Sequence, residues 1–101
     1  MPDEERQLVG ALERVGGLIE QHIAQVAPWT LGAVERESGA LEAHVLVGVG
    51  RSPAHMRFSL RPAGNGVTEV QIEIVAKSRW CTRGLCFRRS HALLDRVEAQ
   101  L

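Results

Sequence analysis

The chain has 101 residues, of which 45% are hydrophobic and 24% charged, and its formal net charge is zero. These values fit one globular domain with a modest core and exclude a disordered chain. No apolar run approaches the roughly 20 residues of a membrane-spanning helix, and the acidic opening segment is unlike a secretory signal. We therefore expect a cytoplasmic protein in which residues 1–101 form a single domain.

The charge is divided unevenly between the two halves of the chain. Residues 1–50 hold eight acids and three bases, a net of −5, whereas residues 51–101 hold four acids and nine bases, a net of +5. Eleven of the twelve bases are arginine, whose guanidinium binds carboxylates and phosphates as a fork. A GC-rich genome would produce the same bias without any function. The overall balance argues against a general nucleic-acid-binding protein, which is normally net basic.

The first segment, residues 3–26, is predicted to form one helix. Its apolar residues recur every three or four positions and would share one face: Leu8, Leu12, Val15, Ile19, Ile23 and Val26. Asp3 is placed to cap the start of this helix, and Pro28 to stop it. Gly16 and Gly17 in its middle favour a bend or the close approach of another element.

From Pro28 onward, apolar residues alternate with polar ones, which is typical of strands. The alternation predicts four strands, at about 29–36, 41–49, 55–61 and 67–78, and residues 62–66 (Pro-Ala-Gly-Asn-Gly) are the strongest turn signal. Helical spacing returns after about residue 82. We therefore expect a two-layer α+β fold: a helix, a four-stranded antiparallel meander and a second helix, with both helices on one face of the sheet.

Three stretches of the chain carry a family resemblance. They are residues 39–43 (Gly-Ala-Leu-Glu-Ala), the strand at 57–62, and residues 77–79 (Lys-Ser-Arg), which Gly84 and an arginine-bearing helix follow. Over about residues 34–101 the chain resembles a family of uncharacterised bacterial and organellar domains. In that family a Gly-x-Ile-Glu-Ala strand and a Val-Arg-Ser-x-Ser-Arg strand lead into a final arginine-rich helix. The resemblance implies no known activity.

The chain departs from that family at two places where the family carries aspartate. Here His55 or Met56 stands at the first place, and Thr82 or Arg83 at the second. The long last strand and amphipathic helix give a looser resemblance to helix-grip domains of the START and polyketide-cyclase type. Those domains are longer, and their first strand and helix pair is not apparent in this sequence. A likeness of fold says little about function.

The segment at residues 77–91 is chemically unusual, because it holds five bases, two cysteines, one tryptophan and one histidine, and no acid. If the last helix begins near Thr82 or Gly84, its free N–H groups and the neighbouring bases would attract an anion or an acidic partner. The candidate residues are Lys77, Arg79, Arg83, Arg88 and Arg89. Alternatively, this segment pairs with the surplus acids of the N-terminal half, within the chain or in a partner chain.

Cys81 and Cys86 are too few and too close for a disulfide scaffold. Their spacing to His91 does not match a zinc motif, and positions 86 and 91 of a helix point in different directions. We therefore expect no metal and no cofactor, and two cysteines that contribute to packing. A thiol role for Cys81 stays open, because it lies near positive charge and a helix start.

The sequence contains no nucleophile, base and orienting acid at a recognisable spacing, so no catalytic residue is predicted. Glu42 and His44 lie on one strand face, across from His55 or Arg57, and would suit an acid–base cluster. A solvated cross-strand ion pair is the commoner outcome of such a pattern.

Two functions follow from these patterns. The first is a non-enzymatic binding or interaction module, in which the basic segment 77–89 contacts an acidic protein partner or the chain associates as a homodimer. The alternative is a domain that binds a small apolar or anionic ligand in a pocket between sheet and helices. Trp29, Trp80 and Phe58 are the candidate pocket residues, because the glycine pairs of the chain would leave room beside the tryptophans.

Overall fold

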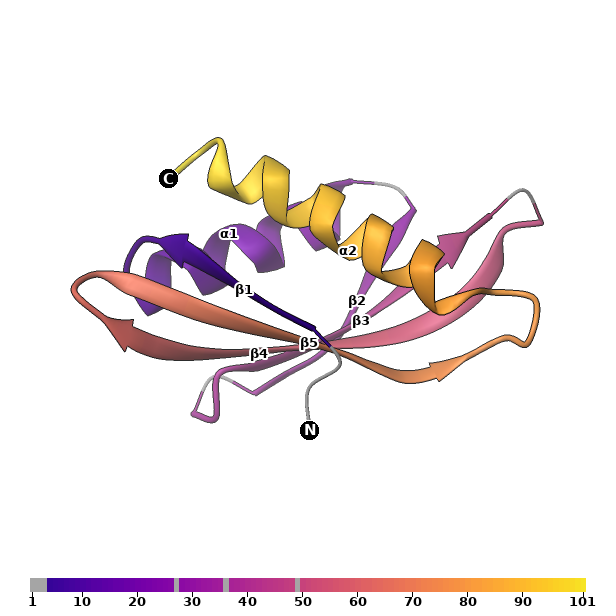
Figure 1. Ribbon diagram of the computed structural model, residues 1–101, viewed down its shortest axis with the longest axis horizontal. Helices are drawn as coiled ribbons and strands as arrows, with labels where there is room; N and C mark the ends of the chain where they lie inside the picture. The colour runs from indigo at the N-terminus through magenta and orange to yellow at the C-terminus, as the bar shows by residue number, and fades with distance from the viewer. Residues whose placement is uncertain (1–3, 27, 36, 49) are drawn as a thin grey trace.

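The computed structural model describes residues 4–26, 28–35, 37–48 and 50–101. The elements follow in the order β1 (Glu4–Val9), α1 (Leu12–Gln25), β2 (Trp29–Glu35), β3 (Ala40–Val47), β4 (Ser52–Gly64), β5 (Val67–Lys77) and α2 (Arg83–Glu98). The strands form one antiparallel sheet in the order β1-β5-β4-β3-β2. Figure 1 shows α1 and α2 on the same side of this sheet.

The sheet has five strands and not four, because the first segment forms a strand before its helix. The prediction of a single helix over residues 3–26 is therefore wrong. β1 pairs with β5, with Leu8 opposite Thr68, and Leu8 is the buried residue of β1. Leu8 continues the apolar spacing of α1 by coincidence. The chain turns between the two elements at Gly10, whose N–H donates to the carbonyl oxygen of Gly66 at 2.7 Å.

The remaining strands are close to the predicted ones, with different ends. β4 begins at Ser52 and continues to Gly64, so the predicted turn at 62–66 shrinks to Asn65 and Gly66. Both residues have positive φ values, 51° and 73°, as a tight hairpin turn requires. The predictions that concern Asp3, Arg36 and Val49 lie outside the described residues.

The core lies between the helices and one face of the sheet. Alternate residues of the central strands are buried on this face, and apolar residues of both helices complete one cluster. Its largest fully buried side chains include Phe58, Met56, Ile72, Ile19, Ile23 and Leu94. The alternate positions of the same strands, such as Glu42 and Arg57, are only partly buried. The sheet therefore has an apolar face under the helices and a polar face on the other side.

Candidate functional sites: a basic tip and an acidic groove

One end of the molecule gathers positive charge from two loops that are far apart in sequence. The turn between β3 and β4 carries Arg51, and the loop between β5 and α2 carries Arg79 and Trp80. The two loops are joined by a hydrogen bond from the Ser78 N–H to the Pro53 carbonyl oxygen at 3.0 Å. Figure 1 shows both loops at the same end of the long axis. We call this surface the basic tip and define it as Arg51, Lys77, Arg79, Trp80 and Arg83.

All five residues of the basic tip are exposed. Trp80 is 75% exposed, and the Arg79 guanidinium carbon lies 5.0 Å from the centre of its ring. The two segments that build the tip, residues 47–54 and 75–83, contain no acid. The basic tip thus presents one large aromatic side chain to water among several cations.

The five predicted basic residues do not form one cluster. Lys77, Arg79 and Arg83 belong to the basic tip, whereas Arg88 and Arg89 are exposed further along α2. Among the described residues, no ion pair joins an acid to Lys77, Arg79, Arg88 or Arg89. Within the described residues, these four side chains are therefore not paired with the acids of the N-terminal half.

The three predicted pocket residues are also separated. Trp29 and Phe58 pack against each other in the core, with ring centres 5.8 Å apart, and both are buried. Trp80 lies on the basic tip, in water. Two of the three residues are therefore part of the core, and the third lies on the surface.

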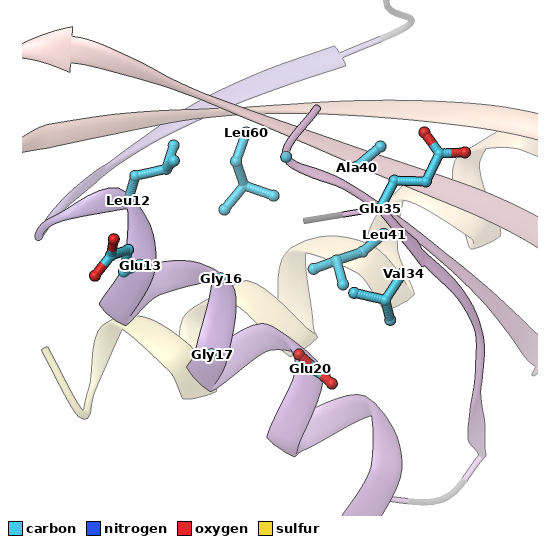
Figure 2. A pocket seen from close by; sticks show the side chains of 11 residues that line it. Leu12, Glu13, Gly16, Gly17, Glu20, Val34, Glu35, Ala40, Leu41 and Leu60 are labelled. Atoms are coloured by element: carbon cyan, nitrogen blue, oxygen red, sulfur yellow. The ribbon is translucent and has the colours of Figure 1, made fainter. Parts of the chain in front are cut away.

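A groove of about 400 Å³ lies elsewhere, between α1 and the strands β2 and β3. Its walls are apolar residues of both layers, and Figure 2 shows Val34, Leu41 and Leu60 directed into the space beside α1. Its described lining residues are Leu12, Glu13, Gly16, Gly17, Glu20, Val34, Glu35, Gly39, Ala40, Leu41 and Leu60. Among these described residues are three glutamates and no base.

The glycine pair of α1 opens this groove. A Cβ atom at Gly17 would meet no atom within 4 Å, and one at Gly16 would lie 3.7 Å from Leu60 Cδ2. The pair thus marks open space and not a close approach of another element. The glycine pair was visible in the sequence. The sequence did not show that Glu13 and Glu35 border the same space, because they belong to different elements.

The polar face of the sheet brings together the residues considered for acid–base chemistry. Glu42 Oε1 lies 2.6 Å from His55 Nε2, and the rings of His44 and His55 stack with centres 4.5 Å apart. The groove lies on the other side of the sheet, next to α1. Glu42 and His55 therefore form a cross-strand contact on the polar face of the sheet, away from the groove.

A second polar cluster on that face joins β1, β5 and β4. Arg61 is hydrogen-bonded to Glu69, which holds the pKa of Glu69 below its usual value. Glu5 also lies beside Glu69, and the hydrogen bond between these two carboxyl groups raises the pKa of Glu5. The cluster thus favours a proton on Glu5 and a charge on Glu69.

No helix in the described part of the chain is long and apolar enough to cross a membrane. The described residues also include no group of three or more metal-ligating side chains. No protein-family model matches the chain, and no curated protein matches it either.

Proposed function

We propose that this chain is a non-enzymatic binding domain that docks onto an anionic membrane surface through the basic tip. The observation that carries this proposal is the 75% exposure of Trp80 among exposed cations, in segments that contain no acid. Tryptophan is favoured at the boundary between lipid and water, and lysine and arginine are attracted to acidic lipid headgroups.

The shape of the molecule favours a membrane over an acidic protein. The basic tip lies at one end of the long axis, and the other two dimensions are 28 and 21 Å. A stable protein–protein interface buries roughly 800 Å² on each partner, which is more than such an end offers. A lipid surface needs no matching area, since a single aromatic side chain and a few cations can anchor a loop to it.

Vesicle binding tests this proposal. Wild-type protein is mixed at low salt with vesicles of phosphatidylcholine alone or with added phosphatidylserine, and binding is followed by co-sedimentation and tryptophan emission. We expect binding only to the acidic vesicles, with a blue shift as Trp80 leaves water. Arg79→Gln should weaken binding about fivefold, since each cation near the surface contributes on the order of 1 kcal/mol. Trp80→Phe should remove the blue shift.

Arg96→Gln is the matched control, because Arg96 is also exposed but lies near the other end of α2. This variant should bind acidic vesicles within about twofold of wild type, since surface charges act only over about a Debye length. Equal loss in the Arg79 and Arg96 variants, or no preference for acidic vesicles, would refute the proposal. Binding to polyglutamate but not to vesicles would favour an acidic protein partner instead.

The groove beside α1 supports a second candidate function, the binding of a small ligand. Its volume of about 400 Å³ is within the usual range for ligand pockets. Because its described lining includes Glu13 and Glu35, it suits an apolar molecule with a positive charge better than the anionic ligand considered from sequence. The order strand, helix, four strands, helix also supports a helix-grip likeness, as a proposal about fold alone.

A pair of probes separates this function from the first. Octylamine and octanol are titrated into the protein by calorimetry. If the groove binds apolar cations, octylamine should bind more tightly than octanol, and Gly17→Met should abolish binding by filling the open space beside Gly17. Equal affinity for both probes would mean that the glutamates play no part. Unchanged binding in the Gly17→Met variant would place the probe elsewhere.

A further inference from the structure

Cys81 and Cys86 face each other where the chain enters α2. Their Sγ atoms lie 2.9 Å apart, and the two residues are 1% and 0% exposed. Thr82 is the N-cap of α2, so Cys81 is the residue before the cap and Cys86 is the fourth residue of the helix. These are the two positions whose side chains pack together in a hydrophobic staple. Here the two side chains that pack together carry thiols, and we call this pair the thiol staple.

The backbone on both sides of the pair is held by local hydrogen bonds. The Cys81 N–H donates to the Ser78 carbonyl oxygen at 3.0 Å, and the Cys86 N–H donates to the Thr82 carbonyl oxygen at 3.2 Å. The Thr82 hydroxyl accepts from the Leu85 N–H at 3.2 Å. The helix start therefore fixes the two thiols beside each other, and no rearrangement of the fold is needed to bring them together.

We propose that Cys81 and Cys86 are a modification site at which a small-molecule disulfide, such as oxidised glutathione, converts the thiol staple into an intramolecular disulfide. One cysteine thiolate attacks the small disulfide, forms a mixed disulfide and releases one glutathione thiolate. The second cysteine then attacks the protein sulfur of the mixed disulfide and releases the other glutathione. Both cysteines lose their protons and are oxidised, and one glutathione disulfide is reduced to two thiols.

The short distance between the sulfur atoms favours the disulfide in the folded chain, because little movement is needed to form it. A disulfide needs the sulfurs at about 2.04 Å, so the pair must close by less than about 1 Å. The reaction should nevertheless be slow. Burial raises the pKa of Cys86 to about 12 and keeps that thiol protonated, whereas the thiolate is the reactive form. Exchange therefore requires transient opening of the loop at residues 78–82, and the decisive measurement is the equilibrium and not the rate.

The test is a titration in glutathione redox buffers, with the whole chain either folded or unfolded in urea. Samples are left to reach equilibrium, quenched with acid and separated by mass, because the oxidised chain is lighter by two hydrogen atoms. We expect the folded chain to be half oxidised at an oxidised-to-reduced glutathione ratio at least about tenfold lower than the unfolded chain. By linkage, the disulfide then stabilises the fold by the same factor.

A double variant, Leu85→Cys with Cys86→Ser, is the matched control, because it moves the second thiol one position out of the staple. In this variant, the folded and unfolded chains should be half oxidised at the same glutathione ratio. An equal or higher ratio for the folded wild type would overturn the proposal, as would a control variant that behaves like wild type. The wild-type comparison alone is decisive if the variant does not fold. The outcome is independent of vesicle binding by the basic tip.

Discussion

The guanidinium of Arg6 in β1 donates a hydrogen bond to the backbone carbonyl oxygen of His91 in α2 at 3.1 Å, across 85 positions of sequence. The same side chain lies 2.6 Å from a carboxylate oxygen of Asp95 and 3.3 Å from one of Glu98. Glu4, two residues earlier, lies 2.6 Å from His91 Nε2. β1 is thus held by β5 through its backbone and by α2 through its charged side chains.

Replacing Arg6 tests how much its contacts with α2 contribute to the stability of the fold. Arg6→Gln should lower the free energy of unfolding by about 1–2 kcal/mol, since hydrogen bonds to charged groups are stronger than neutral ones while exposed carboxylates weaken the ion pairs. Urea unfolding measures the change. Arg96→Gln, on the exposed side of α2, should stay within about 0.5 kcal/mol of wild type. Equal losses in both variants would mean that β1 is held by β5 alone.

This attachment explains why β1 was not apparent in the sequence. Its inward positions carry Glu4, Arg6 and Leu8, so two of the three are polar and give no alternating apolar signal. They are tolerated there because α2 supplies partners that are remote in sequence. The later strands were predictable, since each places several apolar residues on one face. Patterns within one segment reveal burial against an apolar core but not pairing with a distant charge.

The open space beside α1 predicts a stabilising substitution. Gly17→Ala should raise the free energy of unfolding by about 0.5–1 kcal/mol, because alanine favours the helix and the added Cβ meets no atom within 4 Å. Thermal unfolding measures the gain.

The matched comparison is Gly32→Ala in β2, where the added Cβ would lie 2.9 Å from the Glu42 carbonyl oxygen. This variant should lose about 1–3 kcal/mol, because the backbone must move to make room. A higher free energy of unfolding in both variants would mean that β2 shifts easily away from β3. A loss at Gly17 would mean that the groove beside α1 is filled.

The carboxyl pair on the polar face predicts a pH-dependent effect of Glu5→Gln. The pKa of Glu5 is raised above its usual 4.5 by its hydrogen bond to Glu69, so the folded state favours the protonated form. A raised pKa gives stability that is present below pH 4.5 and lost as the pH rises through the folded value. Glutamine keeps the donor without the charge.

The variant should therefore be more stable than wild type at neutral pH and equal to it well below pH 4.5. Thermal unfolding over this pH range measures the difference. Glu37→Gln, an equal charge change in the exposed turn between β2 and β3, should show no such trend. A gain that persists at low pH would contradict the assignment, because both forms of residue 5 then carry a proton.

The two tryptophans should differ in access to solvent. Trp80 is 75% exposed and Trp29 is 8% exposed, so acrylamide should quench the emission of Trp80 strongly and that of Trp29 weakly. Trp80→Phe should remove most of the quenching and change stability by less than about 0.5 kcal/mol, as expected for a surface substitution. Strong quenching that persists in this variant would mean that Trp29 is reached by solvent.

The candidate sites were predictable only in part, for a physical reason. Lys77, Arg79 and Arg83 stand out in the sequence because they are close together along the chain. Arg51 joins them only because the turn between β3 and β4 meets the start of α2, which depends on strand pairing. The contact between Cys81 and Cys86 was predictable in principle, because residues five apart across a helix start form a staple. Such a prediction requires the exact position of the N-cap, which the sequence did not give.

The pairing of the first strand with the last has a consequence for how the chain is made. During synthesis β1 is made before its partner strand, and Thr68 follows its partner Leu8 by 60 positions. The five-stranded sheet therefore cannot form before β5 has been translated. Contacts between such distant segments give a high contact order, which slows folding. We expect β1 to be the last strand to join the sheet, after β5 has been made and paired.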